Sequence, residues 1–185
     1  ARSAVAFVPS NQRGLQIRDD FRAAFEAAGG TLLDWSSYEA ALQDFSQPIA
    51  SLLHVTRSRE RQRRLAANLG VAVQFEARRR EDVDMIFVVA DSRAGRLLAS
   101  QLRFFGACDI PTCATSEIFD PASTARDNDL NDFIFADAPG VIAPDAEAST
   151  MRAELEAHWP QRAGLVRFVD RTAAQIGSAA IARAV

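Results

Sequence analysis

Residues 82–139 read DVDMIFVVADSRAGRLLASQLRFFGACDIPTCATSEIFDPASTARDNDLNDFIFADAP. The stretch opens with an apolar run from Met85 to Ala90, which has the length and composition of a buried strand. An amphipathic segment over about 92–105 follows, and then come two short apolar segments, Pro111 to Ser116 and Phe133 to Phe135. Strand, helix and strand joined by short connections predict a parallel βαβ unit.

The start of the chain shows the same alternation. Ala4 to Pro9 reads as a short strand, and from Gly14 apolar residues recur at helical spacing until Gly29-Gly30, where glycine favours the end of a helix. Thr31 to Trp35 reads as the next strand, which a right-handed crossover would place parallel to the first. The two units together predict a three-layer α/β fold with a Rossmann-like parallel sheet.

The intervening segment is less regular. We expect a helix over residues 40–53, interrupted at Pro48, and a strongly charged helix from Arg57 to Leu69 that ends at Gly70. Val71 to Phe75 has the composition of one more short strand.

The alternation stops near Gly140, where proline and glycine cluster. Beyond it we expect one helix that ends near His158 and a final helix over about 165–184. The predicted organisation is therefore an α/β lobe over residues 1–142 and a helical C-terminal segment over residues 143–185.

Composition excludes several function classes. All 21 basic residues are arginine, and without lysine neither a P-loop nor a Schiff-base site can form. The net charge of −3 disfavours nucleic-acid binding. No apolar run approaches the length of a membrane span, and the sequence contains neither a signal peptide nor a lipobox cysteine, so we expect membrane attachment only through a lipid anchor absent from this segment.

Few residues suggest catalysis or metal binding. His54 and His158 lack ligands at helical spacing, and Cys108 and Cys113 could pair in a disulfide, although small buried cysteines are more common. Oxygen ligands alternate in the stretch 127–132, but the glycine and glutamate of a calcium loop are missing. We expect no catalytic residue, metal or cofactor.

Polar side chains follow the predicted strands. In open parallel sheets, ligands bind beyond the carboxyl ends of the strands. The candidate ligand-binding residues at these positions are Ser10, Asn11, Ser92, Thr115 and Ser116. The simpler interpretation, which we favour, is that Ser10 or Asn11 and Asp91 or Ser92 cap the helices that follow.

A second candidate site is rich in arginine. The candidate partner-binding residues are Arg57, Arg59, Arg61, Arg63 and Arg64, and three more arginines follow at 78–80. An RNA, an anionic lipid surface or an acidic protein could bind them, although no aromatic residues interleave for base stacking. The plainer interpretation is a solvated helix face followed by an exposed loop.

The sequence of residues 82–139 resembles the LppC/LpoA family of outer-membrane lipoproteins, which activate class A penicillin-binding proteins. The resemblance covers most of residues 3–142, and its family pattern is D-[LI]-P, a strand ending in A-T-S, and then D-L-x-G-[IV]-x-F-x-D-x-P-W. The matching residues are Asp109-Ile110-Pro111, Ala114-Thr115-Ser116, Asp129-Leu130, Phe135, Asp137 and Pro139. Asp132 replaces the usual glycine and Gly140 the usual tryptophan, which puts any surface built by that tryptophan in doubt.

The resemblance implies one lobe of a type I periplasmic-binding-protein-like fold, with extra C-terminal helices. It also implies a non-catalytic periplasmic module, anchored in the outer membrane in the full-length protein, that contacts a class A penicillin-binding protein and so activates peptidoglycan synthesis. The pattern assigns no contact residues. The alternative is a periplasmic receptor domain for a small solute, and a hydrolase using the aspartates or cysteines is a third hypothesis.

Overall fold

The computed structural model describes residues 1–39, 41–71, 74–120 and 130–162. The chain divides into two compact units, Ala1–Phe135 and Ala136–Val185. The helix expected over 165–184 and the alternating oxygen ligands at 127 and 129 lie outside the described residues.

The first unit is built on a five-stranded sheet in the order β2-β1-β3-β4-β5, in which every neighbouring pair is parallel. Its strands are β1 (Ser3–Pro9), β2 (Thr31–Tyr38), β3 (Met85–Val88), β4 (Thr112–Ala114) and β5 (Phe133–Phe135). The parallel sheet confirms the predicted α/β fold class, and each strand overlaps a predicted apolar segment.

The helices of the first unit are α1 (Gln12–Ala27), α2 (Ser46–Leu52), α3 (Val55–Leu69) and α4 (Ser92–Phe104), with the 3-10 helix η1 (Ser116–Ile118). The second unit contains α5 (Pro139–Ile142), α6 (Ala146–His158) and the 3-10 helix η3 (Pro160–Arg162). Among the described residues, no helix is both long enough and apolar enough to cross a membrane.

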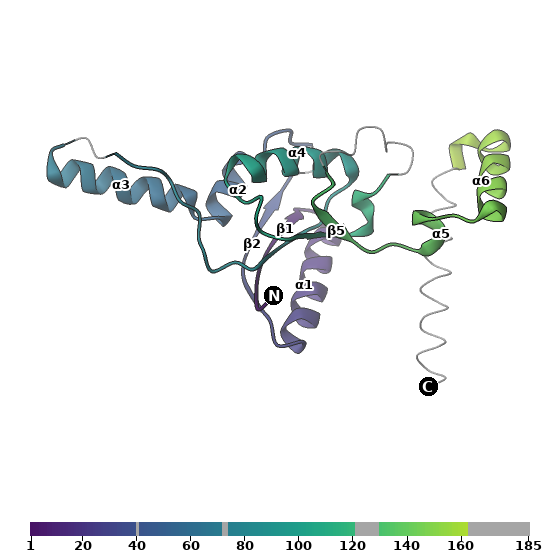
Figure 1. Cartoon of the computed structure of the whole chain (residues 1–185), viewed down its shortest axis with the longest axis horizontal. Helices are drawn as coiled ribbons and strands as arrows, with labels where there is room; N and C mark the ends of the chain where they lie inside the picture. The colour runs from purple at the N-terminus through teal and green to yellow at the C-terminus, as the bar shows by residue number, and fades with distance from the viewer. Residues whose placement is uncertain (40, 72–73, 121–129, 163–185) are drawn as a thin grey trace. The chain divides into compact units, whose positions relative to one another are not determined.

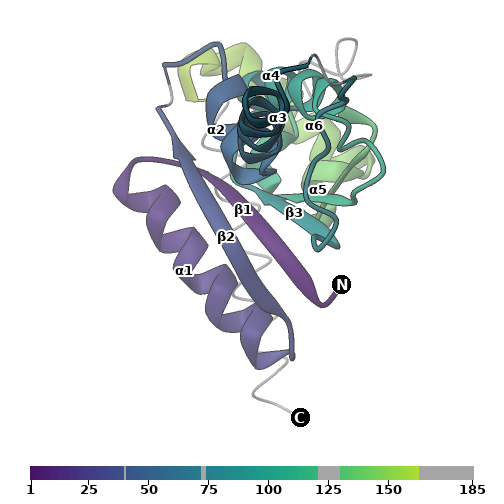
Figure 2. The same cartoon turned by 90° about the vertical axis from the view of Figure 1, so that its left-hand side faces the viewer.

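Helices cover both faces of the sheet (Figure 1). Helix α1 runs along β1 and β2 (Figure 2), where Ala6 and Val8 form a small core and Phe21 stacks on Phe87 with ring centroids 4.0 Å apart. Helices α2 and α4 cover the opposite face. The larger core lies there, because Val5 and Phe7 alternate with Ala6 and Val8 along β1.

The expected helix over 40–53 was wrong in its first half, because α2 begins only at Ser46. Phe45 is fully buried, and its backbone N–H donates to Gln101 Oε1 at 2.8 Å. Asp44 Oδ1 accepts from the Ser46 N–H at 2.8 Å, an Asx turn that competes with helix. Tertiary packing of Phe45 therefore sets the start of α2.

The expected strand over 71–75 was also wrong at the positions that the structure describes. Residues 71, 74 and 75 are not in a strand, and the sheet passes directly from β1 to β3 on that side. Val71 and Phe75 are instead exposed, so apolar composition alone was a poor guide here.

Candidate functional site

The first candidate site is the edge of the sheet formed by the carboxyl ends of its strands. In the strand order β2-β1-β3-β4-β5, the chain passes from β1 outward to β2 on one side and from β3 outward to β4 and β5 on the other. Doubly wound folds bind ligands at such a reversal, which here lies between β1 and β3. Ser10 and Asn11 follow β1, Ser92 begins α4 after β3, and Thr115 and Ser116 follow β4. The structure thus brings all five predicted residues to one edge.

Most of the polar groups here serve the fold. Asn11 Oδ1 accepts from the Gly14 N–H at 2.7 Å and Asp91 Oδ1 accepts from the Ala94 N–H at 2.7 Å, so each caps the helix that follows it. Ser10 Oγ donates to Glu39 Oε1 at 2.9 Å. Capping therefore accounts for Asn11, as the simpler interpretation of the sequence proposed.

Thr115 is the exception at this edge. Its Oγ1 is buried and makes no hydrogen bond with the described protein, whereas its backbone N–H donates to the Val88 carbonyl at 3.1 Å. A buried hydroxyl without a partner costs free energy. A small polar ligand or a water could supply that partner.

Sequence reasoning missed three residues at this edge. Arg13 of α1 forms an ion pair with Glu117 of η1 at 2.6 Å, and the Tyr38 hydroxyl donates to the Val89 carbonyl at 2.8 Å. Burial, and then the Asp91 and Glu117 carboxylates, raise the pKa of Tyr38 far above its usual value, so the phenol stays protonated. Tyr38 ends β2, and its place at the strand terminus is the signal that could have identified it.

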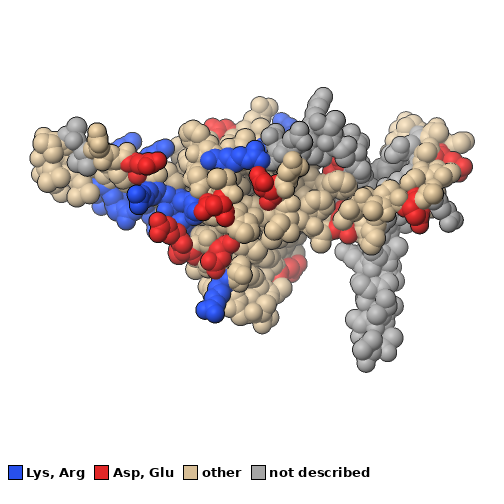
Figure 3. Space-filling view, viewed as in Figure 1, with Lys and Arg blue, Asp and Glu red and all other residues tan. Residues whose placement is uncertain are grey.

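The second candidate site is helix α3. Val55 and Ser58, in its first turn, are buried, whereas all five of its arginines are exposed. Figure 3 shows basic side chains gathered over α3, with acidic side chains beside its start. The sequence correctly indicated a solvated, basic helix face.

The arginines of α3 divide between two faces. Arg57, Arg61 and Arg64, together with His54 and Glu60, line an open hollow of about 310 Å³. Arg59 and Arg63 are not part of this lining. At 100° per residue, they point away from the hollow.

Arg80 anchors the segment that follows α3. The Arg80 side chain is only 9% exposed, and its Nε and Nη2 donate to the Asp82 carboxylate at 2.6 and 2.8 Å. Its backbone N–H donates to the Leu53 carbonyl at 2.9 Å, and its Nη1 lies 3.8 Å from Asp34 Oδ2. Arg80 therefore ties the segment after α3 to the end of α2.

The expectation of an exposed basic loop at 78–80 was therefore wrong for two of its residues. Arg79 pairs with Asp109 at 2.6 Å and donates to the Gly106 carbonyl at 2.8 Å, and Arg80 is buried as described. Nothing local in the sequence indicates these partners, because they lie on distant segments.

Cys108 and Cys113 do not form a disulfide. Both are free thiols, and Cys108 is exposed rather than buried. Cys113 is half-buried, and burial raises the pKa of its thiol. In the described residues no group of three His, Cys, Asp or Glu side chains could hold a metal ion.

Comparison with solved structures shows the fold. A type 1 periplasmic binding protein from Bordetella pertussis Tohama I matches at 16% identity and a TM-score of 0.59, covering 85% of this chain and 36% of that one. The leucine-binding protein LivK from Thermotoga maritima MSB8 matches at 14% identity and a TM-score of 0.55, covering 86% of this chain and 39% of that one. The LpoA (YraM) C-domain from Haemophilus influenzae is described as a regulator of PBP1A. It matches at 13% identity and a TM-score of 0.56, covering 83% of this chain and 40% of that one.

At these identities the likeness shows the type I periplasmic-binding-protein fold and nothing further. The chain spans between 36% and 40% of the length of the three structures. No curated protein matches the sequence. The family model described as "LppC putative lipoprotein" matches residues 1–169, which is most of the chain, and the protein therefore belongs to the LppC family.

Proposed function

We propose that this chain is a non-catalytic interaction lobe that activates peptidoglycan synthesis by contact with a class A penicillin-binding protein. The observation that carries the proposal is membership of the LppC family over residues 1–169. The LpoA C-domain, which shares the fold, is described as a regulator of PBP1A. Of the five arginines predicted to bind a partner, we retain in the proposal the three that line the hollow on α3, Arg57, Arg61 and Arg64.

The chemistry of the sheet edge supports a role without catalysis. Asn11 and Asp91 are occupied in capping helices, and the raised pKa of Tyr38 keeps its phenol from acting as a base near neutral pH. The raised pKa of Cys113 likewise keeps its thiol protonated and weakly nucleophilic.

The mechanism we propose is allosteric. Docking can shift the synthase toward its active conformation only if the lobe binds that conformation more tightly than the inactive one. A differential affinity of about 1.4 kcal/mol changes the ratio of active to inactive synthase about tenfold. The lobe would act in the periplasm, attached to the outer membrane through the lipid anchor of the full-length protein.

The test is binding of the purified chain to a purified class A penicillin-binding protein of the same organism, with transpeptidase activity measured in the same samples. We expect saturable binding and a rise in activity that follows occupancy. Folded protein that neither binds nor stimulates would overturn the proposal.

A second candidate function is binding of a small solute, as in the periplasmic binding proteins with this fold. The buried and unpartnered Oγ1 of Thr115 at the sheet edge favours it. A small molecule released when the same purified chain is denatured, and detected by mass spectrometry, would support the receptor function. Its absence from preparations that stimulate the synthase would leave activation as the function.

A further inference from the structure

Basic charge is concentrated on α3. The helix carries five arginines and one glutamate, a formal charge of +4, in a chain whose net charge is −3. The rest of the chain is therefore acidic. Charges separated in this way steer association with a partner toward one patch of the surface.

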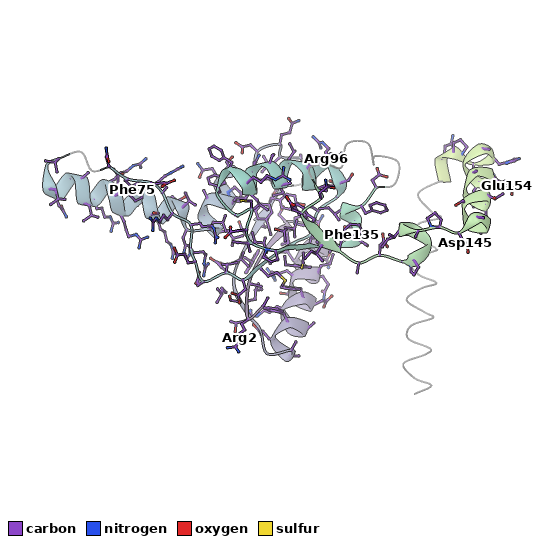
Figure 4. All side chains as sticks on the ribbon, in the orientation of Figure 1. Arg2, Phe75, Arg96, Phe135, Asp145 and Glu154 are labelled. Carbon is purple, nitrogen blue, oxygen red and sulfur yellow. The ribbon has the colours of Figure 1, made fainter. Side chains whose placement is uncertain are left out.

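Apolar side chains lie beside the arginines of α3. The buried Ser58 belongs to the same side of α3 as Leu65 and Leu69, since the three recur at helical spacing. Leu65 and Leu69 are 55% and 61% exposed, so this side of the helix is covered by the fold only near its start. In the described part of the segment that follows, Val71 is 60% exposed and Phe75, labelled in Figure 4, is 44% exposed.

We propose that α3 docks a carboxylate-rich segment of a protein partner through a docking face formed by Arg57, Arg61, Arg64, Leu65 and Leu69. Carboxylates of the partner enter the hollow that the three arginines line together with His54 and Glu60, and three arginines against one glutamate leave it basic. Each planar guanidinium group can bind a carboxylate through two parallel hydrogen bonds. An apolar side chain of the partner covers the two leucines. The identity of the partner as a class A penicillin-binding protein rests on the proposed function.

Charge favours a protein over an anionic membrane as the occupant. An anionic membrane repels a chain whose net charge is −3, whereas a carboxylate-rich protein segment needs to meet only the docking face. Helices that bind membranes also present tryptophan, phenylalanine or several leucines, and the apolar side of α3 offers only two leucines. Nucleic acid is disfavoured because α3 has no aromatic residue.

The test uses two variants of the whole chain with equal charge changes on the same helix. Arg61→Glu with Arg64→Glu reverses the charge inside the hollow, and Arg59→Glu with Arg63→Glu reverses it on the other side of α3. All four arginines are exposed, so we expect both variants to unfold at the same temperature as the unchanged chain.

Binding to the purified class A penicillin-binding protein is then measured at low and high salt. We expect the variant of Arg61 and Arg64 to bind at least about tenfold more weakly at low salt and to lose most of its salt dependence. The variant of Arg59 and Arg63 should change affinity by less than about threefold. Leu65→Ser with Leu69→Ser should weaken binding at both salt concentrations, because salt does not screen apolar contacts.

The outcomes separate this inference from the proposed function. If the unchanged chain does not bind the synthase, both are overturned. If it binds and the two arginine variants weaken binding equally or not at all, only the docking face is overturned. Vesicles of phosphatidylethanolamine and phosphatidylglycerol serve as the second probe. If binding to the vesicles requires Arg61 and Arg64 but binding to the synthase does not, the arginines of the docking face form a membrane contact instead.

Discussion

His54 joins α2 to α3 in a left-handed conformation, with φ of 59°. Its backbone N–H donates to the Ser51 carbonyl at 3.0 Å, and its carbonyl accepts from the Ser58 N–H at 3.0 Å. One residue thus ends one helix and begins the next, and it fixes the direction in which the arginines of α3 point. Histidine and asparagine adopt this conformation more readily than branched residues do.

The charge state of His54 gives the fold a pH dependence. Burial, and then the neighbouring Arg80 and Arg57, lower the pKa of the imidazole below the usual histidine value of about 6.5, against the opposing effect of Asp34 and Asp82. The unfolded chain therefore binds more protons than the folded chain as the pH falls through 6.5. We expect this contribution to stability to be complete above pH 6.5 and to decline below it.

His54→Asn tests this, because asparagine tolerates the left-handed conformation and does not titrate. Urea unfolding of both proteins is compared over roughly pH 5.5 to 8, a range above the titration of most carboxylates. The free energy of unfolding of the variant should match that of the unchanged chain within about 0.5 kcal/mol at pH values near 8. It should fall less than that of the unchanged chain as the pH approaches about 5.5. Parallel pH profiles would contradict this account of the imidazole.

At the scale of elements, the turn from β1 into α1 shapes the sheet edge. A Cβ on Gly14 would overlap the Pro9 carbonyl oxygen and lie 2.6 Å from Pro9 Cγ. Helix α1 can therefore begin this close to the end of β1 only because residue 14 is glycine. The same turn places Asn11 at the helix start and Arg13 opposite Glu117.

Gly14→Ala should destabilise the fold even though alanine favours helix by about 1 kcal/mol over glycine. The clash involves a backbone oxygen that cannot rotate away, so we expect a net loss of about 1–2 kcal/mol in the free energy of unfolding. Gln12→Ala, at an exposed position of the same helix, is the control and should be nearly neutral. A gain of stability in Gly14→Ala would show that the turn relaxes.

The strands and both helix caps could be predicted from the sequence because their signals are local. Apolar runs mark β1 and β3, and Asn11 and Asp91 precede helical patterns. β2 extends beyond the predicted Trp35 to Tyr38, because these less apolar residues pair with β1.

Contacts between distant segments could not be predicted. The pairs of Arg13 with Glu117 and of Arg79 with Asp109 join residues far apart in the sequence, which periodicity does not report. The contact of Phe45 with Gln101, which delays the start of α2, could not be predicted for the same reason. Family resemblance supplied the overall fold, but it assigned no residues to a contact surface.

At the scale of the whole molecule, every strand of the sheet belongs to the first unit, which ends with β5 at Phe135. The pattern of the sequence instead favoured a boundary at residue 142, after the segment that forms α5. The two boundaries differ only in whether α5 belongs to the α/β lobe. We propose the earlier one, because the described residues of both core clusters all belong to the first unit, although Val141 of α5 is also buried.

Fragments ending at Phe135 and at Ile142 distinguish the two boundaries. If the lobe ends with β5, both fragments should fold cooperatively, with thermal midpoints within about 3 °C of each other by circular dichroism. A fragment 1–142 that is clearly more stable than 1–135 would assign α5 to the lobe and favour the later boundary. Binding of the shorter fragment to the synthase, with the same loss on changing Arg61 and Arg64 to glutamate, would further locate the docking face within the parallel-sheet unit.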